Sequence, residues 1–228
     1  MGGQLLMAAI PPGKEELATT TRFLSLQLSK LGVEVRVGQR ATVESITEMR
    51  PEAVVVATGS STVRPDIVGA SLPHVAMARD VIMDRKAVGQ KVVVVGGGRV
   101  GCETAELLVS RAKEVTLVRM TGHGRLAGDM GVMTRRQFLA KLRQSPIAIE
   151  AHSPVERITR EGVIIGKDGQ SVLVEADSVV LAPAPGSDNQ LAEQLKGLVP
   201  ELHIIGDSAE PRGIADAIHE GFRVACEL

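Results

Sequence analysis

A run of closely spaced glycines follows directly on four consecutive valines, and this arrangement can bind phosphate. The segment after Val92–Val95 reads Gly96-Gly97-Gly98-Arg99-Val100-Gly101. Gly96 permits a tight turn, Gly98 removes a side chain that would keep a pyrophosphate from the backbone, and Gly101 lets a helix pack closely on the strand. A helix that begins here offers unpaired N–H groups and the positive end of its dipole to the phosphate.

The residues around the glycine run supply the elements that such a site needs. The four valines predict a buried parallel strand, residues 103–111 predict a helix with Ala105 and Leu108 on one face, and 115–118 predict a second strand. Strand, glycine turn, helix and strand within about 30 residues are typical of a βαβ unit that binds a dinucleotide. The alternative is a glycine-rich turn without a ligand, which the flanking strand and helix make the weaker interpretation.

The end of the second strand favours NADPH over NADH. NAD-binding units carry an acidic residue there, about 20 residues after the glycines, which binds the ribose 2′-hydroxyl. This sequence has Arg119 instead, with Arg125 a few residues further on. A guanidinium accepts no hydrogen bond from a hydroxyl but pairs with a 2′-phosphate. The alternative is that Arg119 only points to solvent.

The remaining segments predict an α/β protein. Helices are expected at 14–31, 79–88, 134–144, 188–195 and from 213 to the C-terminus. A strand is expected at 33–37, and buried strands at 53–57, 179–181 and 203–205. Four short segments, 147–149, 155–158, 163–165 and 172–174, suggest an antiparallel meander.

Composition narrows the classes of function. The 26 basic and 27 acidic residues of this 228-residue chain nearly cancel, which argues against an overall basic surface for nucleic acid or anionic membrane. Three Phe without Tyr or Trp offer no platform for stacking bases. Cys102 and Cys226 are too far apart in sequence for a zinc or iron–sulfur motif and fit a reducing cytoplasm. No signal peptide, membrane span or metal ligand is predicted.

Two further strand ends make a resemblance specific. Ala57-Thr58-Gly59 follows one predicted strand and Gly206-Asp207 follows another, with the dinucleotide unit between them. This order resembles the flavin oxidoreductases in which an NAD(P)-binding Rossmann-like domain is inserted into an FAD-binding domain. The segments Gly2-Gly3-Gln4-Leu5, Pro11-Pro12-Gly13-Lys14, Gly101-Cys102-Glu103 and 206–223 are similar to the group of 2,4-dienoyl-CoA reductase, trimethylamine dehydrogenase and 2-enoate reductase.

The resemblance implies a path of electrons and a set of binding residues. NAD(P)H gives hydride to FAD, and electrons pass through a 4Fe–4S cluster to FMN in a barrel where an activated double bond is reduced. Carried over by position, the residues around the flavin are Gly3, Gln4, Ala57, Thr58, Gly59, Gly206 and Asp207. Glu103 is expected where the two cofactors meet. The alternatives are helix capping for Asp207 and a favourable first-turn charge for Glu103. No catalytic side chain is predicted, because hydride transfer between cofactors needs positioning above all.

The resemblance also implies missing parts. The glycine turn that holds the FAD pyrophosphate, the FMN barrel and the cluster cysteines have no counterpart in this sequence. We therefore expect a fragment: a partial FAD-binding domain at 1–74 and 186–228, and an NAD(P)-binding domain at 75–185. The flavin part is expected to expose a sheet edge unless an N-terminal region or a partner chain covers it. The alternative function is a non-catalytic NADP-binding module or subunit.

Overall fold

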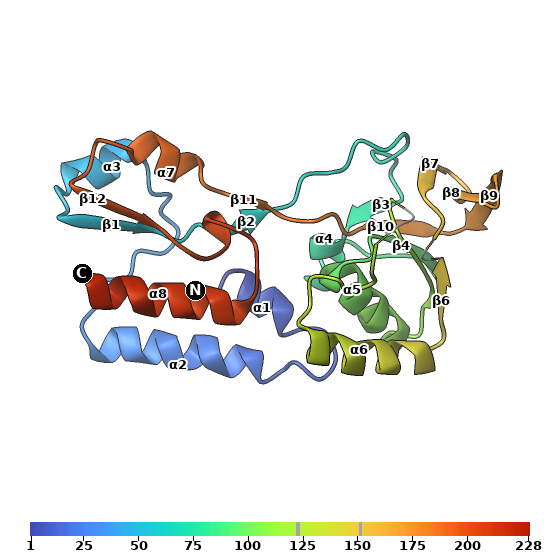
Figure 1. Ribbon diagram of the computed structural model, residues 1–228, viewed down its shortest axis with the longest axis horizontal. Coiled ribbons are helices and arrows are strands. Elements are labelled where there is room, and N and C mark those ends of the chain that lie inside the picture. The colour runs from blue at the N-terminus through green and yellow to red at the C-terminus, as the bar shows by residue number, and fades with distance from the viewer. Residues whose placement is uncertain (122–123, 151) are drawn as a thin grey trace. The chain divides into compact units, whose positions relative to one another are not determined.

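The chain folds into two compact units, seen here in a computed structural model that describes residues 1–121, 124–150 and 152–228. Unit 1 comprises Met1–Leu5, Thr20–Val63 and Pro185–Leu228, and unit 2 comprises Leu6–Thr19 and Arg64–Ala184 (Figure 1). The predicted division at 74/75 and 185/186 differs from these units in two segments and at Pro185, which lies in unit 1. Residues 6–19 and 64–74 belong to the compact unit that carries the glycine run.

Unit 2 is built on a five-stranded sheet in the order β3-β10-β4-β5-β6, in which every pair is parallel. The strands are β3 (Val75–Met77), β4 (Lys91–Val95), β5 (Glu114–Val118), β6 (Ile147–Glu150) and β10 (Ser178–Leu181). The helices of this unit are α4 (Ala78–Ile82), α5 (Arg99–Ser110) and α6 (Val132–Gln144). Because the strands are parallel, their carboxyl ends share one edge, and the glycine run lies there.

The alternating side chains of the valine strand build two separate cores. Val92 and Val94 pack with Ala105 and Leu108 of α5, on the face covered by helices. Val93 and Val95 pack on the opposite face with residues of a meander that includes Ile165. Successive residues of a strand point to opposite faces, so a run of buried valines serves both cores at once.

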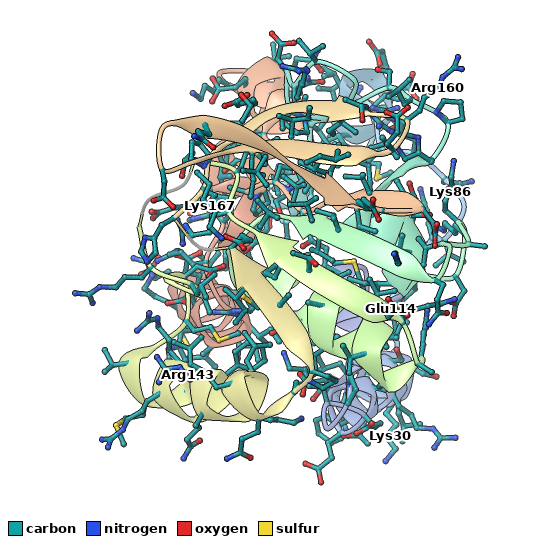
Figure 2. The ribbon with its side chains drawn as sticks, turned by 90° about the vertical axis from the view of Figure 1, so that its right-hand side faces the viewer. Lys30, Lys86, Glu114, Arg143, Arg160 and Lys167 are labelled. Atoms are coloured by element: carbon teal, nitrogen blue, oxygen red, sulfur yellow. The ribbon has the colours of Figure 1, made fainter. Side chains whose placement is uncertain are left out.

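The meander consists of β7 (Val155–Thr159), β8 (Gly162–Lys167) and β9 (Gln170–Glu175), paired antiparallel. Figure 2 looks onto this side, where Lys167 of β8 forms an ion pair with Glu150 of β6 (Nζ to Oε1, 2.9 Å). The expectation that 147–149 belongs to the meander was wrong. This segment is β6, parallel to β5, because it returns to the main sheet after α6 as a βαβ crossover does.

Unit 1 contains a parallel pair of strands, β1 (Ala53–Val56) and β12 (Glu201–Ile204). Helices α3 (Val43–Glu48) and α7 (Gln190–Leu195) pack on it through a small core around Val56, Ala192 and Leu195. A two-residue antiparallel ribbon, β2 (Ser60–Ser61) with β11 (Gly186–Ser187), follows. Helices α1 (Gln4–Ala8), α2 (Leu17–Lys30) and α8 (Ile214–Glu227) and the 3-10 helix η1 (Gly206–Ser208) complete the elements.

Unit 1 leaves apolar residues and strand edges uncovered among the described residues. Within the described residues, β1 and β12 pair only with each other. Val55 is 40% exposed and Phe222 of α8 is 72% exposed. Both strands predicted at 53–57 and 203–205 form, but the prediction that they are buried was wrong, because most of their residues are partly or fully exposed. The predicted strand at 33–37 is absent, because this extended segment has no neighbouring strand with which to pair.

Helix boundaries in unit 2 also differ from the expectation: α5, expected over 103–111, begins at Arg99. The helix predicted over 79–88 ends at Ile82, and Asp84 adopts a left-handed backbone conformation with φ 55°. Among the described residues, no helix is long and apolar enough to cross a membrane.

Candidate functional site

The glycine run forms the turn between β4 and α5, and two of its glycines are required by the fold itself. Gly96 has φ 142°, and a Cβ there would overlap the carbonyl oxygen of Ala182 on the neighbouring strand. A Cβ on Gly101 would overlap the carbonyl oxygen of Gly96. These two positions let α5 begin directly against the sheet, which brings its first N–H groups to the carboxyl edge of β4.

Gly98 is different, because the fold does not require it. Its φ of −77° suits any residue, and a Cβ there would meet only the carboxylate of Asp129, at 3.5 Å from Oδ2. It is the N-cap of α5, and Arg99 is the first helical residue. The missing side chain therefore leaves space in front of the helix N-terminus, where an anion is favoured.

Arg119 lies over the glycine turn. Its backbone follows β5, and its side chain reaches back so that a Cβ on Gly97 would meet its Cγ at 2.7 Å. A Cβ on Gly124 would meet its Nη2 at 2.6 Å. Its Nε and Nη1 are buried without a hydrogen-bond partner in the described part of the chain. Buried guanidinium nitrogens without partners are costly, so these two nitrogens are donors with unused hydrogen-bonding capacity.

Residues 124–131 cover the glycine turn from the side. The N–H of Ala127 donates to the carbonyl oxygen of Gly97 (2.7 Å), and Ala127 and Met130 are buried in the helix-side core. Asp129 of this loop accepts the N–H of Arg99 with both carboxylate oxygens, at 2.8 and 3.1 Å. An acidic side chain therefore already caps α5.

Arg125, also predicted to bind the dinucleotide, lies in the same loop and is exposed. Val100, in the first turn of α5, packs against the helix-side core and its carbonyl oxygen accepts the hydroxyl of Thr104 (2.6 Å).

Cys102, also in α5, is fully buried, and desolvation raises the pKa of its thiol to about 12. It therefore stays protonated and chemically inert at neutral pH.

Glu103 is buried in unit 2 and forms an ion pair with Lys14. It is the fifth residue of α5, so the alternative that it is a first-turn residue stabilised by the helix dipole was wrong. The carboxylate is 7% exposed and the Lys14 side chain 29% exposed. The pair ties the segment 6–19 to the helix that follows the glycine turn.

In unit 1, four of the predicted flavin residues gather at the carboxyl ends of β1 and β12. The Gln4 Nε2 amide donates to the carbonyl oxygen and to the hydroxyl of Ser60 (2.9 and 2.8 Å). The Ser60 hydroxyl donates to Oδ2 of Asp207 (3.0 Å). A Cβ on Gly59, which has φ 83°, would lie 3.5 Å from Gln4 Nε2. Gln4, Gly59, Gly206 and Asp207 thus form one polar cluster joined through Ser60.

Asp207 does not cap α8, which was the alternative for it. It lies within η1, and its Oδ1 accepts the N–H of Arg212 (3.2 Å). Each carboxylate oxygen has one donor and retains a free lone pair for a hydroxyl. The other predicted positions are Gly3, with φ 49°, and Ala57 and Thr58, which are exposed; the Thr58 hydroxyl donates to the carbonyl oxygen of Asp188.

Sequence reasoning missed Ser60, Asp129 and Glu220. Ser60 directly follows the Ala-Thr-Gly motif, so its place at a strand end was available as a signal. Glu220 of α8 accepts the N–H of Gly206 (2.6 Å) and pairs with Arg212. No local pattern relates Asp129 to Arg99 or Glu220 to Gly206, since 30 and 14 residues separate the partners.

Curated relatives match the whole chain. It is 34% identical to a metal reductase of Desulforamulus reducens over 98% of its length, 35% to an NADH oxidase of Thermoanaerobacter brockii over 100%, and 32% to a cinnamate reductase of Clostridium sporogenes over 99%. It spans only 34–38% of the length of these relatives.

Solved structures of related enzymes also match the whole chain. All of this chain superposes on 34% of a 2-naphthoyl-CoA reductase with a TM-score of 0.89 and 30% identity. It also superposes on 38% of the histamine dehydrogenase from Rhizobium sp. 4-9 with a TM-score of 0.81 and 23% identity, which shows the shared fold. The resemblance drawn from the strand-end motifs is confirmed by these matches.

The family model described as pyridine nucleotide-disulphide oxidoreductase matches residues 15–199. Membership implies binding of FAD and NAD(P). With this match and the relatives above, the chain belongs to the pyridine nucleotide-disulphide oxidoreductase family, in the group that includes 2,4-dienoyl-CoA reductase and trimethylamine dehydrogenase.

Proposed function

We propose that this chain binds NADPH on the glycine turn of unit 2 and FAD at the polar cluster of unit 1, and serves hydride transfer from NADPH to FAD. The observation that carries the proposal is the guanidinium of Arg119, whose Nε and Nη1 are buried without a partner, among the described residues, beside a glycine turn. When both cofactors are bound, the nicotinamide supplies a hydride and the flavin accepts it.

The residues of unit 2 fit a dinucleotide phosphate group. The first N–H groups of α5 point to the space that Gly98 leaves open, and they suit the diphosphate. Arg119 provides N–H donors in a fixed plane, and such a fork matches the oxygens of the ribose 2′-phosphate. NADH lacks that phosphate, so the arginine favours NADPH.

Calorimetric titration of the chain with NADPH and with NADH tests this assignment. We expect the lower dissociation constant for NADPH, and Arg119→Glu should reverse the preference because a carboxylate repels the phosphate and accepts a hydroxyl. Arg143→Glu is the matched control: Arg143 is exposed on α6 and lies at the surface (Figure 2). Equal affinities in the wild-type chain, or the same change from both substitutions, would contradict the role of Arg119.

The polar cluster of unit 1 fits a polyhydroxyl chain. The free lone pairs of Asp207 accept hydroxyl donors, and the left-handed Gly59 and Gly206 bring backbone close to the cluster without side chains in between. We assign Asp207 to the ribityl hydroxyls of FAD, with Gln4 and Thr58 beside the ring system. Onward transfer to a 4Fe–4S cluster and FMN belongs, in this proposal, to a longer protein.

An absorption spectrum tests the flavin assignment directly. The chain has no Tyr or Trp, so bound flavin would dominate its spectrum in the near ultraviolet and the visible. Incubation with FAD and removal of the free cofactor should leave a yellow protein, and Asp207→Ala should reduce the bound fraction. Asp66→Ala, in unit 2, is a control. A colourless wild-type chain overturns FAD binding by this chain alone.

The exposed apolar surface of unit 1 favours a second candidate function, an NADP-binding part that needs further polypeptide to hold FAD. The two-stranded sheet has free edges among the described residues, and Phe222 and Val37 are 72% and 70% exposed. The covering segment would supply strands and the site for the FAD pyrophosphate. If the chain binds NADPH but gains FAD only when co-expressed with the remaining N-terminal part of a relative, this function replaces the first.

A further inference from the structure

We propose that Asp129 is an internal competitor of the NADPH diphosphate, so that NADPH binds only after this carboxylate has left the N-terminus of α5. The inference rests on the proposed function, because it concerns the same glycine turn. It assigns a role to a residue that neither the sequence motif nor the resemblance points to.

The contact between Asp129 and α5 is the one that an anionic ligand makes. Arg99 is the first residue of the helix, so its N–H has no partner inside α5. Both carboxylate oxygens of Asp129 accept this N–H, at 2.8 and 3.1 Å. The carboxylate also lies 3.5–3.9 Å from the Cβ position of Gly98, directly beside the space that this glycine leaves open.

The loop holds Asp129 in this place through its own packing. The Ala127 N–H donates to the Gly97 carbonyl oxygen, and the Arg99 guanidinium donates through Nη2 to the Asp129 carbonyl oxygen (2.8 Å). Ala127 is fully buried and Met130 nearly so. A packed segment thus presents this exposed carboxylate to the helix N-terminus.

A diphosphate and this carboxylate exclude each other for two reasons. Both are negative and both need the Arg99 N–H, and like charges a few Å apart repel each other. Moreover, the space beside Gly98 already contains the carboxylate. NADPH binding therefore includes the cost of breaking the Asp129 cap, and the observed affinity is lower than the turn alone would give.

Calorimetric titration with NADPH of the wild-type chain, Asp129→Asn and Asp177→Asn tests the inference. Asp177 is a matched control: its Oδ2 also accepts backbone N–H groups, those of Gln90 and Lys91 (2.9 and 2.7 Å), but at the opposite end of β4. Asparagine can still accept the Arg99 N–H, so the substitution removes only the negative charge at the helix N-terminus, which corresponds to roughly a 2- to 5-fold change in equilibrium constant. We expect Asp129→Asn to bind NADPH tighter by that factor and Asp177→Asn to bind like the wild type.

A second measurement keeps the inference testable if Asp129→Asn does not fold. In the wild-type chain, the ¹³C resonance of the Asp129 carboxyl and the amide resonance of Arg99 should both shift on saturation with NADPH. Unchanged or weaker binding by Asp129→Asn, or an unshifted carboxyl resonance with NADPH bound, overturns the competition while the proposed function stands. Failure of the wild-type chain and of Asp129→Asn to bind NADPH overturns the proposed function, and this inference with it.

Discussion

Gly98 and Gly101 belong to one motif, yet the structure predicts that alanine at 101 will mainly lower stability and that alanine at 98 will mainly weaken NADPH binding. A Cβ at 101 overlaps the carbonyl oxygen of Gly96 and comes within 3.4 Å of the Ala182 Cβ, so α5 must move away from the sheet. Overpacking of this kind costs about 1–3 kcal/mol. For a chain of this size that lowers the melting temperature by roughly 2–12 °C.

Alanine at 98 meets no such obstacle, because its φ is ordinary and its Cβ has only van der Waals contact with Asp129. The remaining cost is that of replacing an N-cap glycine, roughly 0.5–1 kcal/mol. Gly131 is the matched control: it is the N-cap of α6, has φ −58°, and its Cβ position is empty. We expect Gly98→Ala and Gly131→Ala to melt within about 2 °C of each other.

NADPH affinity should distinguish the two variants that have similar stability, Gly98→Ala and Gly131→Ala. A methyl group at 98 fills the space proposed for the diphosphate and should weaken NADPH binding by about 5- to 150-fold, which corresponds to the 1–3 kcal/mol of one overpacked site. Gly131→Ala should bind normally. Melting is followed by circular dichroism, since a chain without Trp or Tyr has little intrinsic fluorescence. Normal NADPH binding by Gly98→Ala, or normal stability of Gly101→Ala, would refute this division of roles.

Three further predictions concern charges and thiols. A thiol reagent at pH 8 should modify only Cys226 in the folded chain and both cysteines after unfolding, because burial raises the pKa of Cys102 to about 12; modification of two thiols in the folded chain would contradict this. Lys14→Met should lower the free energy of unfolding by about 1–3 kcal/mol, less than for a fully buried pair because the Lys14 side chain is 29% exposed. Lys196→Met, which breaks an exposed pair, should lower it by under about 0.5 kcal/mol. Equal losses in denaturant titrations would be evidence against a special role for the Lys14–Glu103 pair. The hydrogen bonds from Arg212 and the Gly206 N–H lower the pKa of Glu220 below its ordinary 4.5, so its contribution to stability is present above pH 4.5 and lost as pH falls through the lowered pKa. Glu220→Gln should therefore reduce the melting temperature at pH 7, and the difference in melting temperature from the wild type should become smaller in acid. A difference that is constant with pH would disprove the linkage.

Local sequence patterns predicted the parts of the fold that are formed by residues close together in the sequence. The valine strand, the glycine turn and α5 follow from consecutive residues, and the apolar segments 163–165 and 172–174 predicted the neighbouring strands β8 and β9. The strand at 33–37 was wrong because alternation predicts a strand only where another strand is available for pairing. For β6, a short apolar segment did not reveal whether the partner is a hairpin neighbour or a strand reached through a helix.

The candidate site divides in the same way. Residues that act through backbone geometry, such as Gly96 and Gly101, were found because few structures besides a strand–turn–helix junction require glycine at this spacing. Arg119 was found because its position is counted from the glycines. Asp129 and Ser60 act through side chains that reach partners distant in sequence, and a carboxylate or hydroxyl in a loop has many uses. Such contacts depend on tertiary packing: Asp129 had no local signal, and the position of Ser60 after the Ala-Thr-Gly motif did not identify its partners.

The order of strands in unit 2 also has a consequence for synthesis of the chain. β10 lies between β3 and β4, yet it is the last strand of this sheet to be translated. Until residues 178–181 leave the ribosome, β3 has no partner in this sheet and one edge of β4 is open. One edge of the valine strand therefore stays unpaired while α5, α6 and the meander are synthesised. This predicts that the sheet is completed slowly and late, and that its open edge must be kept from aggregating during that interval.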